Sequence, residues 1–259
     1  MPNDQFDPRA YWEERLTAQP NLRGVGHRRF SMDYNAAMYQ VALENLDAVL
    51  ALGPVAVPGR RVLDIGPGLG HFLRRYVERG AGQVLGVDIT AASVAALQAE
   101  FPQHRFQCAD VSDLTPAELG QHDLVSVINV IFHIVDEGRF ERTLRTLGRC
   151  VAPGGYFLLV DSLYGGPQPA VTHARPRPLA RYRPLLAEVG LTVRAIRPMY
   201  YIMGHPLLPV LLAPLIDRPA VLPYVVRFER WLARRAPVRL SAMQYLLAQA
   251  PAQPREPSP

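Results

Sequence analysis

The residues of this sequence that could do chemistry gather in the stretch 61–70, Arg-Val-Leu-Asp-Ile-Gly-Pro-Gly-Leu-Gly. Asp64 lies two residues before Gly66, and further glycines follow at Gly68 and Gly70. Because glycine has no Cβ, such a turn can take positive φ and lets a ligand approach the main chain closely. A carboxylate beside the turn suits a cationic group and would repel a pyrophosphate. The stretch therefore predicts a ligand site that favours positive charge.

The glycine spacing distinguishes between two cofactor classes. The dinucleotide fingerprint is Gly-x-Gly-x-x-Gly, which brings a pyrophosphate onto a helix N-terminus. Here the third glycine is Gly70, and position 71 is a histidine. The pattern Asp64-x-Gly66-x-Gly68-x-Gly70 resembles instead the first motif of the class I S-adenosylmethionine-dependent methyltransferases. In that family the turn faces the methionine part of the cofactor.

Further matches to this family follow in the right order over residues 60–161. A second strand, 83–88, ends in Asp88, which by resemblance accepts both ribose hydroxyls, as a carboxylate can. After a third strand, Asp110 and Val111 take the places of the residues that contact the adenine amino group and ring. The resemblance implies S-adenosylmethionine as the cofactor. It implies these cofactor-binding residues: Asp64, Gly66, Gly68, Gly70, Asp88, Ile89, Asp110, Val111 and Asn129.

The elements that must position these residues alternate between strand and helix. Strands are predicted at 61–65, 83–88, 105–108, 123–129, 156–161, 191–196 and 244–248. The fold expected from the resemblance is α/β, a Rossmann-like seven-stranded, mostly parallel sheet with helices on both faces. We expect an N-terminal helical cap (1–55), an α/β core (56–200), a helical insertion (201–240), the last core strand (241–250) and a disordered tail (251–259).

The insertion is long for a connection between two strands. It contains an apolar, proline-broken run at 206–216, too short to span a bilayer, and an amphipathic stretch at 223–235. Three interpretations stay open, in this order: a lid over an apolar substrate, a homodimer contact, or a surface that rests on a membrane.

Catalysis by such an enzyme needs a base when the acceptor is a hydroxyl. His133 follows the C-terminal end of the fourth strand and is the first candidate; the alternative is a histidine that packs the next helix. His27 and Tyr11 are further candidates. By resemblance the N-terminal segment lies over the cleft, so Tyr11, Trp12, His27, Tyr34 and Tyr39 are candidate cleft residues, unless they pack the segment on the core.

Other features of the sequence bear on metal ions, nucleic acid and cellular location. The fourth strand ends in Asn129, which leaves Asp161 as a lone carboxylate that would seldom hold magnesium, so no metal is expected. The net charge of +5 and the pI of about 9.5 reflect arginines spread through the chain, so nucleic-acid binding is not expected. The N-terminus has no signal peptide, which predicts a cytoplasmic location.

Together these patterns predict a bacterial S-adenosylmethionine-dependent methyltransferase. The expected acceptor is a small, partly apolar molecule of the secondary-metabolite or glycan kind, with a hydroxyl preferred over an amine or carbon. One alternative, motivated by the basic pI, is an RNA or protein methyltransferase. A second alternative is a nucleotide-binding oxidoreductase.

Overall fold

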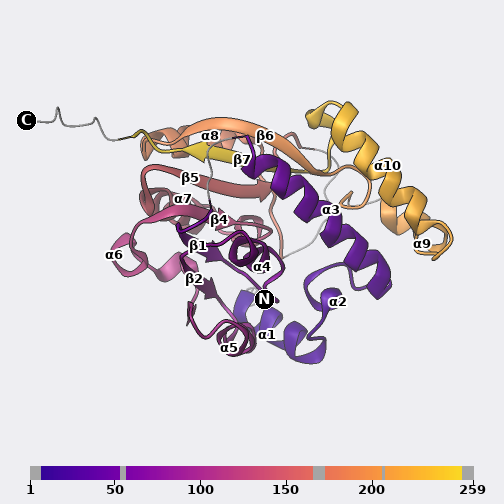
Figure 1. Cartoon of the computed structure of the whole chain (residues 1–259), viewed down its shortest axis with the longest axis horizontal. Coiled ribbons are helices and arrows are strands. Elements are labelled where there is room, and N and C mark those ends of the chain that lie inside the picture. Colours follow the sequence, from indigo (N-terminus) through magenta and orange to yellow (C-terminus); the bar gives the residue numbers. More distant parts are fainter. Residues whose placement is uncertain (1–6, 53–56, 166–172, 206–207, 253–259) are drawn as a thin grey trace, which may run out of the picture.

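The computed structural model describes residues 7–52, 57–165, 173–205 and 208–252. Its centre is a seven-stranded sheet with the order β3-β2-β1-β4-β5-β7-β6 (Figure 1). Only β7 runs antiparallel to its neighbours, β5 and β6. This confirms the predicted fold class. The strands are β1 (Arg61–Ile65), β2 (Gln83–Asp88), β3 (Arg105–Cys108), β4 (His122–Val127), β5 (Val151–Asp161), β6 (Thr192–Tyr200) and β7 (Met243–Gln249).

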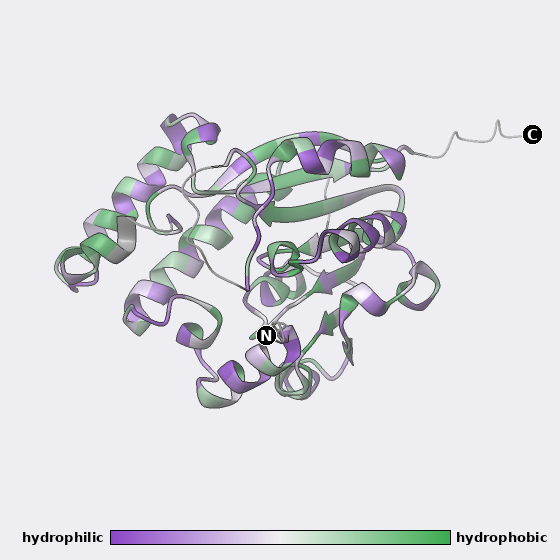
Figure 2. Cartoon of the chain, turned by 180° about the vertical axis from the view of Figure 1, so that it is seen from behind, coloured by the Kyte–Doolittle hydropathy of each residue, from purple (hydrophilic) through white to green (hydrophobic). Residues whose placement is uncertain are grey.

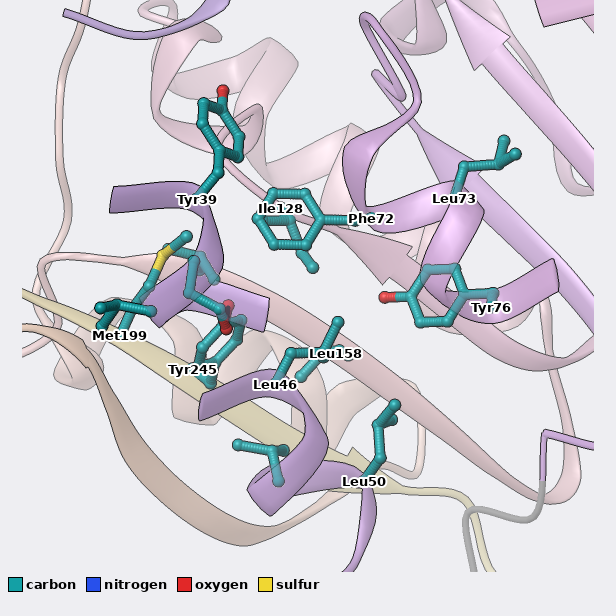
Figure 3. Close-up of a cluster of buried hydrophobic side chains, with 14 of the residues drawn as sticks. Tyr39, Leu46, Leu50, Phe72, Leu73, Tyr76, Ile128, Leu158, Met199 and Tyr245 are labelled. Carbon is teal, nitrogen blue, oxygen red and sulfur yellow. Dashed lines mark hydrogen bonds between the residues drawn. The ribbon is translucent and has the colours of Figure 1, made fainter. Parts of the chain in front are cut away.

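Helices cover both faces of the sheet. The face in Figure 3 packs against α3 (Met32–Leu50), α4 (His71–Glu78) and α5 (Ala91–Glu100). The other face packs against α6 (Pro116–Leu119), α7 (Glu137–Arg149) and α8 (Leu179–Glu188). The remaining helices are α1 (Pro8–Ala18), α2 (Leu22–Val25), α9 (Leu208–Ile216) and α10 (Leu222–Arg235), with single turns at η1 (Val111–Asp113), η2 (Ile131–His133) and η3 (Val238–Leu240).

The core explains why the central strands read as nearly continuous apolar runs. Parallel strands are covered on both faces, and alternate residues of β1 enter different clusters, Val62 on the α4 side and Leu63 and Ile65 on the α7 side. Helix α4 buries Phe72, Leu73 and Tyr76, one face of a 3.6-residue repeat. The strand ends, and the side chains that follow them, are thereby held rigidly.

Several boundaries differ from the sequence prediction. The strand predicted at 156–161 begins earlier, at Val151, so Pro153-Gly154-Gly155 lies inside β5. There the register with β4 jumps from His122↔Val151 to Leu124↔Tyr156. A bulge accommodates the extra residues, with Gly154 at φ +74°. Strand β6 continues to Tyr200, pairing with β7 throughout. Within the predicted helical cap, the first helix, α1, ends at Ala18, and a second short helix, α2, follows it.

The insertion folds as α9 and α10, on the side of the molecule next to α3 (Figure 1). Arg230 of α10 pairs with Glu44 of α3 at 2.6 Å. None of the helices in the described part of the chain combines the length and hydropathy that crossing a bilayer requires. Most of the predicted tail, 253–259, lies outside the described residues.

Candidate active site

A cavity of about 280 Å³ opens at the carboxyl ends of β1, β2 and β4. The strand order reverses between β1 and β4, and ligands of open α/β sheets bind at this switch point. The walls come from the glycine turn after β1, the ends of β2 and β4, the loop after β3, and residues of α1 and α3. The cavity is thus where the sequence motif predicts a ligand.

The glycine turn is shaped by backbone that only glycine adopts readily. The φ angles are +65° at Gly66, +54° at Gly68 and +79° at Gly70. A Cβ on Gly66 would lie 2.2 Å from Val130 Cγ2, and one on Gly70 would lie 2.6 Å from Leu97 Cδ2. Bare backbone therefore forms this part of the wall.

Asp88 ties the glycine turn to the end of β2. Its Oδ2 accepts a hydrogen bond from the backbone N–H of Gly68 at 2.9 Å. Its Oδ1 accepts from the N–H and the hydroxyl of Thr90, at 2.9 and 2.7 Å. A carboxylate offers about four acceptor positions, so three are in use. The bidentate ribose contact predicted for Asp88 would have to replace one of these bonds.

Asp110 follows β3 as Asp88 ends β2, and its carboxylate is also fixed by hydrogen bonds. Its Oδ1 accepts from the N–H of Ser112 at 2.8 Å, and its Oδ2 accepts from Arg139 at 2.9 Å. Arg139 also contacts Asp113 at 3.0 Å and lines the cavity. Arg139 is not predictable from the sequence, because no motif signals an arginine that reaches this loop from the first turn of α7.

Two buried acceptor atoms beside the turn have no hydrogen-bond partner, Asp64 Oδ2 and Asn129 Oδ1. Asn129 lines the cavity at φ +59°, the one positive φ outside glycine among the described residues. Burial raises the pKa of Asp64 to about 7, as does the nearby charge of Asp88, while a hydrogen bond from Ser126 opposes the shift. Unmatched acceptors next to a glycine cradle fit a ligand that brings donors and positive charge, as the methionine part of S-adenosylmethionine does.

His133 forms the wall on the other side. Its Nδ1 lies 2.7 Å from the carbonyl oxygen of His173. A carbonyl only accepts, so Nδ1 carries the proton and Nε2 has the free lone pair. Burial lowers the pKa of His133 to about 4. The hydrogen bond with the His173 carbonyl opposes this shift, and the nearby charges of His173 and Arg15 add to it. The ring is therefore neutral near pH 7 and can accept a proton only transiently.

Aromatic rings surround His133. Trp12 meets its ring edge-to-face at 5.0 Å between centroids, and the His173 ring stacks on it at 5.8 Å. Tyr11 in turn stacks on His173 at 5.1 Å. The side of the cavity that contains His133 is thus assembled from α1, η2 and the segment before α8.

Two polar contacts hold α1 in this position. The carboxylate of Glu13 accepts from the N–H groups of Ala91 and Ala92, at 2.9 and 3.3 Å, in the first turn of α5. Arg15 donates to the carbonyl oxygen of Gly26 at 2.6 Å. The tripeptide Tyr11-Trp12-Glu13 therefore combines residues of the aromatic wall with the group that fastens them.

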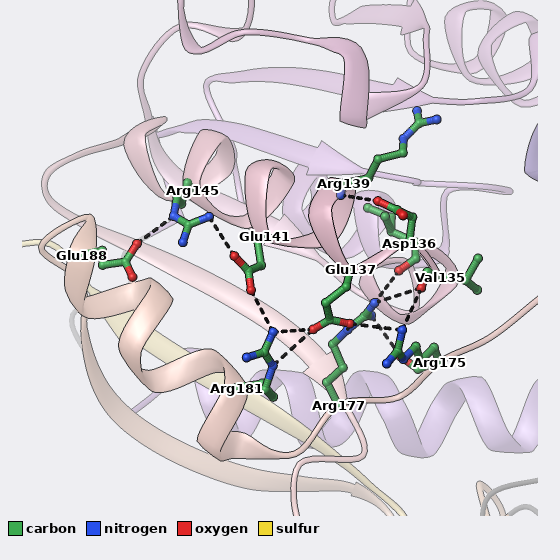
Figure 4. Close-up of polar contacts among 11 residues, drawn as sticks. Val135, Asp136, Glu137, Arg139, Glu141, Arg145, Arg175, Arg177, Arg181 and Glu188 are labelled. Atoms are coloured by element: carbon green, nitrogen blue, oxygen red, sulfur yellow. Dashed lines mark hydrogen bonds and ion pairs between the residues drawn. The ribbon is translucent and has the colours of Figure 1, made fainter.

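The segment that presents His173 is held by an ionic network (Figure 4). The Arg177 side chain, 3% exposed, pairs with Glu137 at 3.1 Å and donates to the Ile134 carbonyl oxygen at 2.8 Å. Asp161 accepts from the N–H groups of Arg177 and Ser162 and from the Tyr182 hydroxyl. Among the described residues, no three His, Cys, Asp or Glu side chains group together as they would around a metal ion.

The structure brings most of the predicted site residues together. Trp12, Gly66, Gly68, Asp88, Ile89, Asp110, Val111, Asn129 and His133 line the cavity. Asp64, Gly70, Tyr11, His27 and Tyr34 do not.

Two of these candidates face other surroundings. Tyr34 is fully buried, stacks on Phe30 at 4.1 Å and donates to the Met203 carbonyl oxygen. His27 packs against Phe30, and burial lowers its pKa. A role in packing thus explains both residues.

The sequence analysis also missed His71. It lines the cavity directly after the glycine turn, 4.6 Å from the ring of Tyr39, and its buried Nε2 has no partner. Burial lowers the pKa of His71 to about 4. The only signal in the sequence was its position after Gly70.

The chain is similar to known methyltransferases in part of its sequence and in its fold. Residues 62–155 match the model of a methyltransferase domain family. A ubiquinone biosynthesis O-methyltransferase from Albidiferax ferrireducens is 32% identical over 124 residues, 46% of this chain and 47% of the relative. A tRNA U34 carboxymethyltransferase from Trichlorobacter lovleyi is 35% identical over 118 residues, 44% of this chain and 35% of the relative. The chain thus spans less than half the length of these curated relatives.

A solved structure extends the fold comparison to nearly the whole chain. The magnesium protoporphyrin IX methyltransferase of Synechocystis PCC 6803, solved with bound S-adenosylmethionine, superposes with a TM-score of 0.61 at 16% identity. The superposition covers 96% of this chain and 99% of that one. At this identity the likeness concerns the fold.

Proposed function

We propose that this chain, which has the fold and the domain of a class I S-adenosylmethionine-dependent methyltransferase, transfers a methyl group to an oxygen atom of a small molecule. The observation that carries the proposal is one cavity with two unlike walls. The glycine turn, Asp88 and Asp110 form one wall, and His133 with its free Nε2 forms the other.

The cofactor, when bound, supplies a methyl group already activated on a sulfonium. The chain then has to hold two molecules close together and aligned, which is where most of the rate enhancement of such a displacement arises. Asp88 and Asp110 are held by three and two hydrogen bonds, so they are rigid acceptors. The unpartnered Oδ1 of Asn129, in the cavity lining, suits the charged end of the cofactor.

A small acceptor is supported by the size and lining of the cavity. A volume of about 280 Å³ is at the lower end of ordinary ligand sites. Because the cofactor and the methyl acceptor have to meet there, little room is left for the acceptor. Trp12, Val25, Tyr39 and Phe72 make the lining beyond the turn mainly apolar. An extended polymer such as tRNA would need a basic groove leading to the site. The described part of the cavity lining contains one arginine, Arg139, and Asp110 neutralises it.

The low pKa of His133 narrows the class of hydroxyl. A phenol has a pKa of about 10, so transfer of its proton to a histidine of pKa about 4 is uphill by about 8 kcal/mol, at about 1.36 kcal/mol per unit. Less acidic alcohols are worse substrates for such a base. We therefore expect an acidic hydroxyl, such as a phenol or enol, whose proton His133 accepts only as the methyl group is transferred.

The test measures transfer of labelled methyl from S-adenosylmethionine to panels of phenols, aliphatic alcohols, amines, bulk RNA and bulk protein. We expect label in the phenol panel. Label in RNA or protein alone would overturn the proposal, as would tight NAD binding without S-adenosylhomocysteine binding.

His133→Asn removes the proposed base and leaves the cofactor-binding groups in place. It should lower kcat by 10² to 10⁴, the range for general-base catalysis, and leave the Kd for S-adenosylhomocysteine within about twofold. His27→Asn makes the same change outside the cavity and should leave kcat intact. An unchanged kcat in His133→Asn would assign His133 to packing alone.

A further inference from the structure

The outer surface of α9 and α10 is the largest part of the described molecule that the proposed reaction does not use. Ten large apolar side chains are exposed among the described residues, and six of them lie on these two helices. They are Leu211, Leu212, Leu215, Tyr224, Phe228 and Trp231, with exposures from 43% to 74%. None of the side chains that the structure describes in either helix lines the cavity, so a lid role has no support here.

Helix α10 has two distinct faces. Leu222 and Glu229 are buried against the body, and Glu229 accepts from the N–H groups of Tyr201, Ile202 and Met203. Tyr224, Phe228 and Trp231 recur at i, i+4 and i+7 on the outer face. The rings of Phe228 and Trp231 stack at 5.7 Å. Hydrophobic and hydrophilic residues alternate along these helices in Figure 2.

The charges on this surface have one sign. Arg227, Arg234 and Arg235 are exposed on α10 and form no ion pair with another described residue. The two acidic residues of the helices and their connection are both engaged elsewhere: Glu229 is buried, and Asp217 accepts from Ser31. The surface therefore offers positive charge and apolar side chains with no free carboxylate among its described residues.

We propose that α9 and α10 form a docking surface for a membrane rich in anionic lipid. Arginines are attracted to the lipid headgroups, Trp and Tyr favour the interface, and leucine side chains gain by entering the acyl boundary. A second copy of the chain fits less well, because a two-fold contact would oppose the same arginines across the axis. RNA fits less well because its charged phosphate backbone gains nothing from contact with the exposed side chains of Leu211, Leu212 and Leu215.

The connection to the body makes the surface relevant to the enzyme. α10 is fastened to α3 by the Arg230–Glu44 pair, and Tyr39 of α3 lines the cavity. Docking would hold α3, and with it one wall of the cavity, near the bilayer. Membrane binding itself needs neither cofactor nor turnover, so its test is independent of the proposed activity.

The test is co-sedimentation of the full chain with vesicles of phosphatidylglycerol and phosphatidylcholine, against vesicles of phosphatidylcholine alone. We expect binding to the anionic vesicles that is reduced at least tenfold by 0.5 M salt, because the attraction is screened. Arg227→Glu/Arg235→Glu should reduce it at least tenfold, at about fivefold or more per charge. The control Arg149→Glu/Arg183→Glu makes the same charge change on α7 and α8 and should bind as wild type.

The apolar part is tested by Phe228→Ser/Trp231→Ser, which should reduce binding at least tenfold while the circular dichroism spectrum and Tm stay those of the wild type. If either α10 variant unfolds, quenching of tryptophan fluorescence by brominated lipid decides the matter: we expect quenching in the wild-type protein and its loss in Trp231→Phe, where Trp12 is the remaining tryptophan. Equal binding to neutral vesicles, or no binding to either kind, would overturn the proposal. A dimer that the α10 substitutions dissociate, or retention on RNA in place of vesicles, would also overturn it.

Discussion

The two walls of the cavity differ in how they are built. The cofactor-side wall consists of the glycine turn, Asp88 and Asp110, each at or just after the end of a parallel strand. The acceptor-side wall combines Trp12 of α1 and His133 of η2, and the main-chain carbonyl of His173 holds the His133 ring. The first wall uses the rigid edge of the sheet. The second is assembled from three segments that only the folded chain brings together.

The difference shows where each property originates. On the cofactor side, the nearest supports lie in the motifs themselves: Thr90 and Gly68 hold Asp88. Ser112 holds Asp110, which also accepts from Arg139 of α7. On the acceptor side, the supports are distant: Glu13 fastens α1 to α5, and Arg177 fastens the His173 segment to α7. We therefore expect substitutions in the first wall to have large, local effects and those in the supports of the second to have smaller ones.

The largest expected effect concerns Asp64, which is buried in β1 next to the glycine turn of the first wall. Its folded pKa of about 7 exceeds the unfolded value of about 3.8, so the folded state favours the protonated form. The resulting loss of stability is absent below about pH 4, grows between pH 4 and 7, and is complete above pH 7. A pKa difference of about 3 units corresponds to about 4 kcal/mol in the free energy of unfolding.

Asp64→Asn should therefore unfold at a higher urea concentration than the wild type at pH 8 and at a similar one at pH 4, in the absence of cofactor. It should also bind S-adenosylmethionine more weakly, because it loses the negative charge. Asp113→Asn, at a 72% exposed side chain, is the control and should change neither quantity by more than about 0.5 kcal/mol. A variant less stable than wild type at pH 8 would contradict the assigned pKa.

Gly66→Ala comes next. Alanine at φ +65° is strained by about 1–2 kcal/mol, and its Cβ would lie 2.2 Å from Val130, adding overpacking of about 1–3 kcal/mol. We expect calorimetry to show about 150-fold weaker binding of S-adenosylhomocysteine, since the turn must shift. At Gly120, φ is +76° and an added Cβ would have no atom within 4 Å. Gly120→Ala is therefore the control for backbone strain without overpacking. Equal binding by both variants and the wild type would show that the turn does not hold the cofactor.

These cases show how far the sequence alone could lead. The strands β1, β2 and β3 and the turn between β1 and α4 follow from consecutive residues, an apolar run ending at a carboxylate or at glycines. The acceptor wall does not, because the atom that sets the His133 tautomer is a main-chain carbonyl, 40 positions away. A carbonyl has no sequence signature. Tyr34 was misleading for a related reason, since aromatic residues of a core and of a cleft look the same in sequence.

Asp88→Ala tests the more detailed prediction within the first wall. Loss of a charge-assisted contact should weaken S-adenosylhomocysteine binding by about 1.5–3 kcal/mol. The variant also removes the acceptor for the Gly68 N–H. Thr90→Val removes the hydroxyl bond to Asp88 and the cap that Thr90 gives the Ser93 N–H. It leaves the Asp88 carboxylate in place and should weaken binding by about 1 kcal/mol or less. An unchanged Kd in Asp88→Ala would reject the ribose assignment.

Glu13 offers the smallest effect and the sharpest test of the comparison, because it touches neither wall. Glu13→Ala removes the acceptor for two N–H groups of α5 and the favourable charge at a helix N-terminus, together about 1 kcal/mol. It should raise the KM for the acceptor about fivefold through the loosened α1, with the Kd for S-adenosylhomocysteine nearly unchanged. Glu14→Ala, on the exposed side of the same helix, should change neither. If Glu13→Ala instead weakened cofactor binding as much as Asp88→Ala, α1 would belong to the cofactor wall, and the division of the cavity into two separately built sides would fail.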